Sequence, residues 1–251
     1  MGLYVVSGSA SGIGAATRAH LEARGDEVIG VDLAGQDVSA DLSQPSGRAD
    51  ALAALRPLCG RQLSGLVVAA GLGASHPRTE EIIAVNYFGC VALLDGLRDL
   101  LVAGNGAAVA LSSNTALSLP DFGGPLEEVC LGNREAEALT DAAELEGPRC
   151  YVSSKRALIR YVRREAPGWM RGGARLNAIA PGPVRTPLLT RDLAHETIGP
   201  RLDEFPVPAG GPAEPSVIAD AIAFLLDHPF CCGTVLCVDG GGDSELRPDA
   251  I

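Results

Sequence analysis

A glycine-rich turn between an apolar run and a helical pattern constrains the fold most strongly. Leu3–Ser7 is typical of a buried strand, and Ile13–Arg24 has the periodicity of a helix. Between them we expect Gly8 to permit a sharp turn, Gly12 to let a pyrophosphate approach the backbone, and Gly14 to allow close helix–strand packing. A strand, this glycine spacing and a helix together indicate a dinucleotide-binding unit.

Apolar runs continue to alternate with helical patterns along the chain. Further strands are expected over Glu27–Asp32, Gly65–Ala70, Ala107–Leu111, Arg175–Ala180 and Thr234–Val238, and further helices over Ser46–Leu58, Thr79–Val102, Tyr151–Trp169 and Ser216–Leu226. Continuous apolar strands between helices favour a parallel sheet covered on both faces. We predict one α/β domain over residues 1–251, a doubly wound Rossmann-type fold with seven parallel strands. Residues 119–148, after the serines that follow the Ala107–Leu111 strand, break the alternation and predict a helical insertion.

Composition excludes several classes of function. The net charge of −11 disfavours nucleic-acid binding, because an acidic surface repels phosphate backbones. No apolar run is long enough to span a bilayer, and the N-terminal residues lack the basic region of a signal peptide, so no membrane association is expected. Seven cysteines without metal spacing favour free thiols in the cytoplasm. The four histidines also lack metal spacing, so we expect no metal site.

An acidic residue at the end of the second strand bears on the cofactor. Asp32 lies eighteen positions after Gly14, where a carboxylate can accept hydrogen bonds from the ribose hydroxyls of adenosine and would repel a 2′-phosphate. Leu33, and not an arginine, follows it. The sequence therefore favours NAD over NADP.

A tyrosine and a lysine four positions apart suggest the chemistry. Tyr151 and Lys155 share one face of a predicted helix, and Lys155 is the single lysine among 20 Lys and Arg residues. A tyrosine with an ordinary pKa of about 10 is a poor base near neutrality. A nearby ammonium stabilises the phenolate and lowers that pKa. The pair is suited to remove a hydroxyl proton while hydride leaves the adjacent carbon.

The glycine spacing and the segment Tyr151-Val152-Ser153-Ser154-Lys155 resemble the short-chain dehydrogenase/reductase family over essentially the whole chain. Other segments that resemble family motifs are Asp41-Leu42, Ala69-Ala70-Gly71, Asn86-Tyr87-Phe88-Gly89, Ser112-Ser113 and the run from Pro181 to Pro187. Two departures are Ser7, where threonine is usual, and the absence of asparagine from residues 69–71. The resemblance implies an NAD-dependent oxidoreductase that acts on CH–OH groups.

The resemblance also implies a role for each matching residue. Ser113 would bond the substrate oxygen, Tyr151 would act as the base, Lys155 would bond the ribose hydroxyls, and Asn86 would hold a backbone distortion and a water in a proton relay. The implied cofactor-binding residues are Gly8, Ser11, Gly12, Ile13, Gly14, Asp32, Leu33, Asp41, Leu42, Ala70, Gly71, Tyr151, Lys155, Pro181, Gly182, Val184 and Thr186.

A narrower resemblance concerns the substrate and the assembly. The long gap between Ser113 and Tyr151 resembles the bacterial 3α-hydroxysteroid dehydrogenase/carbonyl reductase subgroup, which implies a hydrophobic alcohol or ketone as substrate. Residues 188–212 would form a mobile lid, although their apolar side chains suit ordinary packing equally well. The implied substrate contacts are Ser113, Leu117, Leu119, Tyr151 and Leu188. In that subgroup the insertion is linked to blocking a tetramer interface, so we expect a homodimer through Ser216–Val238, with a tetramer as the alternative.

Two other functions stay open on the sequence alone. An aromatic or terpenoid alcohol, as for coniferyl-alcohol-type dehydrogenases, could replace the steroid, and no residue discriminates the two. A catalytically silent NAD-binding sensor would have an incomplete catalytic set, whereas Asn86, Ser113, Tyr151 and Lys155 are all present. The role of the tail after Val238 is also open.

Overall fold

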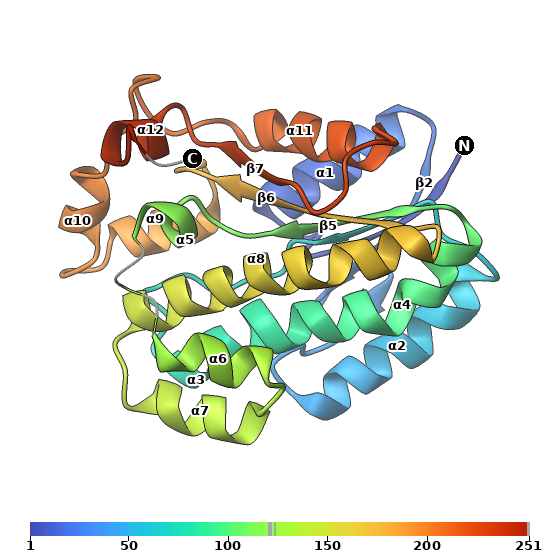
Figure 1. Ribbon diagram of the computed structural model, residues 1–251, viewed down its shortest axis with the longest axis horizontal. Helices are drawn as coiled ribbons and strands as arrows, with labels where there is room; N and C mark the ends of the chain where they lie inside the picture. Colours follow the sequence, from blue (N-terminus) through green and yellow to red (C-terminus); the bar gives the residue numbers. More distant parts are fainter. Residues whose placement is uncertain (120–121, 123, 250–251) are drawn as a thin grey trace.

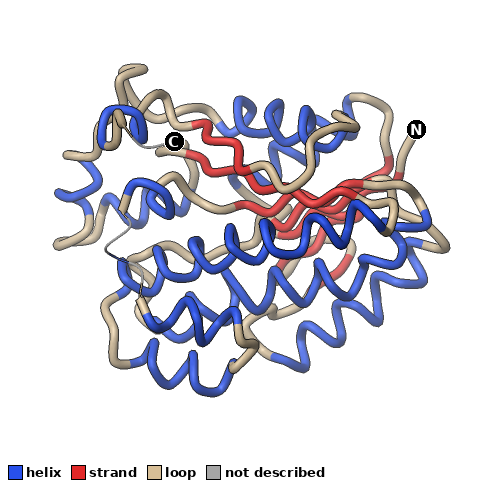
Figure 2. Tube along the Cα trace, viewed as in Figure 1, coloured by secondary structure: helices blue, strands red, loops and turns tan. Residues whose placement is uncertain are grey.

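A parallel sheet forms the centre of the molecule (Figure 2). The structure is a computed structural model that describes residues 1–119, 122 and 124–249. Among these residues the strands are β1 (Leu3–Ser7), β2 (Glu27–Asp32), β3 (Val38–Ser39), β4 (Gly65–Val68), β5 (Ala107–Leu111), β6 (Arg175–Pro181) and β7 (Val235–Val238). Their order is β3-β2-β1-β4-β5-β6-β7, and every pair is parallel. The predicted doubly wound fold with seven parallel strands is confirmed.

Helices cover both faces of this sheet (Figure 1). Those described are α1 (Gly12–Ala23), α2 (Pro45–Cys59), α3 (Thr79–Ile83), α4 (Cys90–Ala103), α5 (Thr115–Ser118), α6 (Pro125–Leu131), α7 (Glu135–Ala143), α8 (Gly147–Arg171), α9 (Pro187–Leu193), α10 (Gly199–Asp203), α11 (Pro215–Asp227) and α12 (Gly242–Leu246). Helices α1 and α11 pack together on one face, and α2, α4 and α8 lie on the other (Figure 1). A hydrophobic cluster fills the space on each face, because strands buried on both sides are apolar throughout.

Three elements differ from the sequence-based predictions. The strand β3 is only two residues long, too short for any periodicity to reveal it. The helix predicted over Thr79–Val102 is divided into α3, a π-helical segment η1 (Ala84–Gly89) and α4. A π-helical turn is a local widening that hydrophobic spacing does not predict, and such turns are frequent at functional sites. Helix α8 begins at Gly147, four residues before the predicted start.

The predicted insertion consists of α6 and α7, which form an outer layer (Figure 1). Helix α6 packs on α8, and α7 packs on α3. The insertion therefore covers the helix layer and not the sheet. Of its described residues, only Leu119, Phe122 and Pro148, near its two ends, line the large cavity described below.

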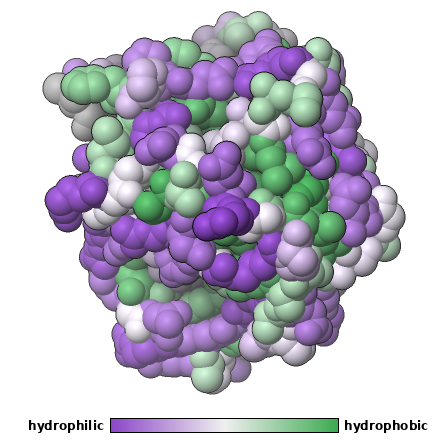
Figure 3. Space-filling view, turned by 90° about the vertical axis from the view of Figure 1, so that its right-hand side faces the viewer, coloured by the Kyte–Doolittle hydropathy of each residue, from purple (hydrophilic) through white to green (hydrophobic). Residues whose placement is uncertain are grey.

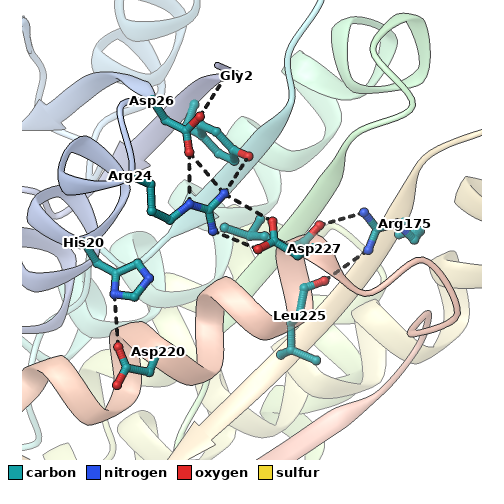
Figure 4. A network of polar contacts seen from close by, with 10 residues as sticks. Gly2, His20, Arg24, Asp26, Arg175, Asp220, Leu225 and Asp227 are labelled. Carbon is teal, nitrogen blue, oxygen red and sulfur yellow. Dashed lines mark hydrogen bonds and ion pairs between the residues drawn. The ribbon is translucent and has the colours of Figure 1, made fainter.

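Charged side chains join α1 to α11 at the edge of the sheet where the strands begin (Figure 4). The Arg24 guanidinium donates hydrogen bonds to Asp26 at 3.1 Å and to Asp227 at 2.8 Å. His20 lies 3.0 Å from Asp220. Arg175 of β6 donates to the carbonyls of Leu225, Leu226 and His228, at the C-terminal end of α11. A cation there satisfies carbonyls that lack a partner within the helix.

The surface at this edge is mainly hydrophilic, with hydrophobic residues gathered in a hollow toward the right of Figure 3. Large apolar side chains are also exposed on α11 and in the loop after it: Val217 and Phe224 by about half, and Phe230 by 91%. None of the helices in the described part of the chain is both long and apolar enough to cross a membrane.

Candidate active site

A cavity of about 600 Å³ opens where the strands end. It is lined by the turn between β1 and α1, by the ends of β2, β4, β5 and β6, and by residues of α8, α9 and α10. The C-terminal ends of the strands lie at the left of Figure 1, where α5, α9, α10 and α12 gather. Open parallel sheets bind ligands beyond the carboxyl ends of their strands, at the point where strand order reverses. In this sheet the order reverses between β1 and β4.

The glycine turn forms one wall of this cavity. A Cβ at Gly8, whose φ is +70°, would lie 2.7 Å from the amide nitrogen of Ala70. A Cβ at Gly14 would lie 2.1 Å from the carbonyl oxygen of Gly8, so the first turn of α1 packs directly against the loop. Gly12, with φ +57°, faces the methyl group of Thr186. The absence of side chains lets this turn pack closely while Gly8, Gly12 and Gly14 line the cavity at the N-terminus of α1, where free amides and the helix dipole favour an anion.

Two aspartates lie near one end of the cavity. The Asp32 carboxylate accepts hydrogen bonds from the amides of Ala10 at 3.0 Å and Leu33 at 2.7 Å. Asp41 accepts one from the Ser43 amide at 2.9 Å. These contacts fix each carboxylate beside its loop while Asp32, Leu33, Asp41 and Leu42 all line the cavity.

Ser113, Tyr151 and Lys155 line the same cavity, beside the end of β5. The Lys155 ammonium donates to the carbonyl of Leu111 at 2.9 Å and lies 5.8 Å from the centre of the Tyr151 ring. Ser113 Oγ lies 2.9 Å from Thr115 Oγ1. Ser113 and Lys155 are buried in the surrounding protein.

The surrounding protein shifts the pKa of Tyr151 and that of Lys155. Burial raises the pKa of Tyr151 to about 12; hydrogen bonding by Ser113 opposes that rise, and the charge of Asp192 adds to it. Burial lowers the pKa of Lys155, since an ammonium loses hydration there. Tyr151 is thus not a base near neutral pH until a further positive charge or a substrate contact stabilises its phenolate.

Asn86 lies behind the cavity wall and does not line it. Its side chain, within η1, accepts from the Leu72 amide at 2.7 Å and donates to the Leu72 carbonyl at 3.0 Å and to Ser154 Oγ at 3.3 Å. A Cβ on Gly71 would lie 3.3 Å from Asn86 Oδ1 and 3.4 Å from Lys155 Nζ. Asn86 therefore holds the loop after β4 next to the lysine.

All the other predicted site residues line the cavity except Leu117. Thr115 and Leu119 line the cavity, whereas Leu117 of the short helix α5 is not among the lining residues. Its contact with the substrate stays a prediction.

Several lining residues were missed by the sequence reasoning. The carboxylate of Asp192 in α9 is buried and accepts from the amides of Ala74 at 3.3 Å and Ser75 at 3.0 Å, which fastens α9 to the loop after β4. No sequence pattern marks this contact, because its partners are backbone amides more than a hundred residues away. The other lining side chains that were missed include His76, Arg78, Glu81 and Phe122. The predicted lid segment 188–212 contributes further lining residues: Arg191, Ile198, Arg201, Leu202 and Phe205. Within the described residues no group of His, Cys, Asp and Glu could hold a metal ion.

Known proteins are similar to this chain along most of its length. It is 39% identical over 254 residues to the 3-alpha-hydroxysteroid dehydrogenase/carbonyl reductase of Comamonas testosteroni, and the match covers 99% of each protein. It is 34% identical over 195 residues to the coniferyl-alcohol dehydrogenase of a Pseudomonas strain, covering 74% of each. Residues 139–243 match a sequence family described as enoyl-(acyl carrier protein) reductase.

A solved structure is similar in three dimensions as well. The crystal structure of the 3-alpha-hydroxysteroid dehydrogenase from Pseudomonas sp. B-0831 complexed with NADH superposes with a TM-score of 0.95 at 41% identity. The superposition covers 99% of this chain and 100% of that one.

Proposed function

This chain belongs to the short-chain dehydrogenase/reductase family, and on that basis we propose that it interconverts a hydrophobic secondary alcohol and its ketone with NAD. The proposal rests on one observation. A single cavity is lined by the Tyr151–Lys155 pair and Ser113, and also by the glycine turn and Asp32. A dinucleotide site and a proton-transfer site thus share one space.

The lining residues fit a dinucleotide with an unmodified ribose. The turn at Gly8, Gly12 and Gly14 lines the cavity beside the N-terminus of α1 and suits a diphosphate, and the Asp32 carboxylate suits ribose hydroxyls and would repel a 2′-phosphate. The remaining cofactor contacts that we propose are Ser11, Ile13, Leu33, Asp41, Leu42, Ala70, Gly71, Tyr151, Lys155, Pro181, Gly182, Val184 and Thr186. When bound, NAD accepts the hydride from the alcohol carbon or returns it to the ketone.

The chain's own residues handle the proton. In the oxidation direction Tyr151 takes the hydroxyl proton, and Ser113 donates a hydrogen bond that stabilises alkoxide character on the same oxygen. Lys155, fixed by its bond to Leu111, stabilises the phenolate by its charge. Asn86 holds the loop at Leu72 next to Lys155, which supports its part in a proton relay.

The apolar side of the cavity suits a bulky hydrophobic alcohol. Leu119, Phe122, Leu188, Ile198, Leu202 and Phe205 line it. Together with the similarity to a 3-alpha-hydroxysteroid dehydrogenase, this supports a 3α-hydroxysteroid as the leading substrate. Helices α9 and α10 within residues 188–212 would act as the lid over it. The similarity to a coniferyl-alcohol dehydrogenase supports an aromatic alcohol as the second candidate.

We propose a homodimer formed through α11 and β7. Val217, Phe224 and Phe230 expose apolar surface there, and β7 lies at the sheet edge. Light scattering at the mass of a dimer supports this assembly, and a tetramer mass contradicts it. All seven cysteines are free, which supports a reducing cytoplasm as the location.

A panel of steroid, terpenoid and aromatic alcohols and ketones, assayed with NAD and NADP through NADH or NADPH absorbance, tests the function. We expect turnover of a 3α-hydroxysteroid with NAD. Tyr151→Phe should lower kcat by about 10²–10⁴ while NADH binding persists, because only the proton-transfer group is removed. Full turnover by Tyr151→Phe contradicts the mechanism, and preference for NADP contradicts the assignment of Asp32.

A further inference from the structure

A buried arginine connects the insertion to the loop at one end of the cavity. Arg48 of α2 is only 7% exposed. Its guanidinium donates to the carbonyls of Leu42 at 3.0 Å and Ser43 at 3.2 Å, and to Glu135 of α7 at 3.0 Å. Leu42 and Ser43 line the cavity. One side chain thus bonds the insertion and the cavity wall at the same time.

A second arginine makes the same kind of connection near the proton-transfer site. Arg156 follows Lys155 in α8 and donates to the carbonyl of Ala116 at 2.8 Å and to Glu127 of α6 at 2.7 Å. Glu127 is 3% exposed. Ala116 lies in α5, three residues after Ser113. The insertion therefore contributes one buried or half-buried carboxylate to the contacts behind each end of the cavity.

These two pairs differ from the other ion pairs of the insertion. Glu137 pairs with Arg134 on the same helix, and both are about half exposed. Glu128 is also exposed where it pairs with Arg160. A solvated pair of this kind contributes little, whereas a buried charge, here the Arg48 guanidinium or the Glu127 carboxylate, needs its counter-charge to keep its position.

We propose that the insertion positions both ends of the NAD-binding cavity through these two Glu–Arg–carbonyl contacts. Glu135 and Arg48 position the Leu42–Ser43 loop that receives the adenine end of the dinucleotide. Glu127 and Arg156 position the segment that carries Ser113. The inference rests on the proposed function, since it assumes that the cavity holds the dinucleotide in that orientation. It assigns the insertion a role within one subunit, beyond any effect on assembly.

The contact between Glu135 and Arg48 is tested by calorimetry, which measures the binding of dinucleotide fragments without turnover. Glu135→Gln should weaken AMP and ADP-ribose binding by about tenfold, within the range of typical couplings between sites, and leave nicotinamide mononucleotide binding unchanged. Arg48→Lys should have the same effect, because a single ammonium nitrogen lacks the planar fork of three nitrogens that reaches both carbonyls and Glu135. Glu137→Gln is the matched control on the same helix. Wild-type AMP affinity in both Glu135→Gln and Arg48→Lys, or an equal loss in Glu137→Gln, overturns the proposal.

At the contact between Glu127 and Arg156 we expect a loss of turnover without a loss of AMP affinity. Glu127→Gln should lower kcat by about tenfold with AMP affinity and the KM for NAD unchanged, because the Ser113 segment loses its support while the Leu42–Ser43 loop keeps its own. Glu128→Gln is the control on the same helix. Equal effects of Glu127→Gln and Glu135→Gln on AMP affinity indicate general destabilisation and overturn the proposal. Failure of the wild-type protein to bind NADH contradicts the proposed function itself.

Discussion

The Lys155 ammonium lies 5.8 Å from the centre of the Tyr151 ring and donates a 2.9 Å hydrogen bond to the carbonyl oxygen of Leu111. The two residues are one helical turn apart on α8, whereas Leu111 ends β5. The packing of α8 against the end of that strand thus fixes the charge beside the phenol. Burial of both groups makes their protonation sensitive to any charge added to the cavity.

The first prediction concerns the protonation of Lys155. Burial lowers its pKa from the usual value of 10.5, because the ammonium is poorly hydrated. Lysine labelled with ¹³C at Cε should give one NMR signal, since the chain has a single lysine. We expect its titration midpoint below that of free lysine. A midpoint at or above 10.5 contradicts the burial of this ammonium.

The second prediction is a pair of opposite shifts in the pH profile. In the proposed mechanism alcohol oxidation requires the Tyr151 phenolate, so we expect the rate to rise with pH through the pKa of Tyr151. Ser113 lowers that pKa and Asp192 raises it. Ser113→Ala should therefore move the rising limb to higher pH, and Asp192→Asn should move it to lower pH. Profiles of kcat/KM check this, and shifts of the same sign would argue against Tyr151 as the base.

The third prediction concerns the choice of cofactor. Asp32→Asn keeps a side-chain acceptor for the amides of Ala10 and Leu33 but removes the charge. The ratio of kcat/KM for NAD over NADP should fall at least about tenfold, because juxtaposed like charges cost several kcal/mol. Asp50→Asn, an exposed site on α2, is the control. An unchanged ratio in Asp32→Asn would remove Asp32 from the ribose site.

The fourth prediction compares two glycines in helices. A Cβ at Gly14 would lie 2.1 Å from the Gly8 carbonyl oxygen, so Gly14→Ala should lower the free energy of unfolding by about 1–3 kcal/mol. At Gly168 in α8 the nearest contact of such a Cβ is 3.4 Å, to the flexible Arg98 side chain. Gly168→Ala should raise the free energy of unfolding by about 0.5–1 kcal/mol through helix propensity. Urea denaturation measures both, and a stable Gly14→Ala variant would be inconsistent with this turn.

Local patterns accounted for most of the fold and for the residues of the candidate site. The spacing of Gly8, Gly12 and Gly14 and the four-residue step from Tyr151 to Lys155 are properties of one turn and one helix, so the chain order reveals them. The alternation of apolar runs and helical patterns likewise indicated a parallel sheet. Leu117 is not among the lining residues, and the sequence could not settle this because proximity to Ser113 does not say which way α5 turns its side chains.

Tertiary structure decided what depends on distant partners. Strand β3 exists because it pairs with β2, and the π-helical turn at Asn86 accompanies bonds to Leu72 and Ser154. Arg48 meets Glu135 across 87 residues of sequence, a contact that no periodicity encodes. The sequence alone determined the fold class, the dinucleotide turn and the Tyr–Lys pair, since each follows from local spacing. Only the packing of α6, α7 and α9 decided what supports and encloses the cavity, because those contacts join segments that approach each other only after the sheet has formed.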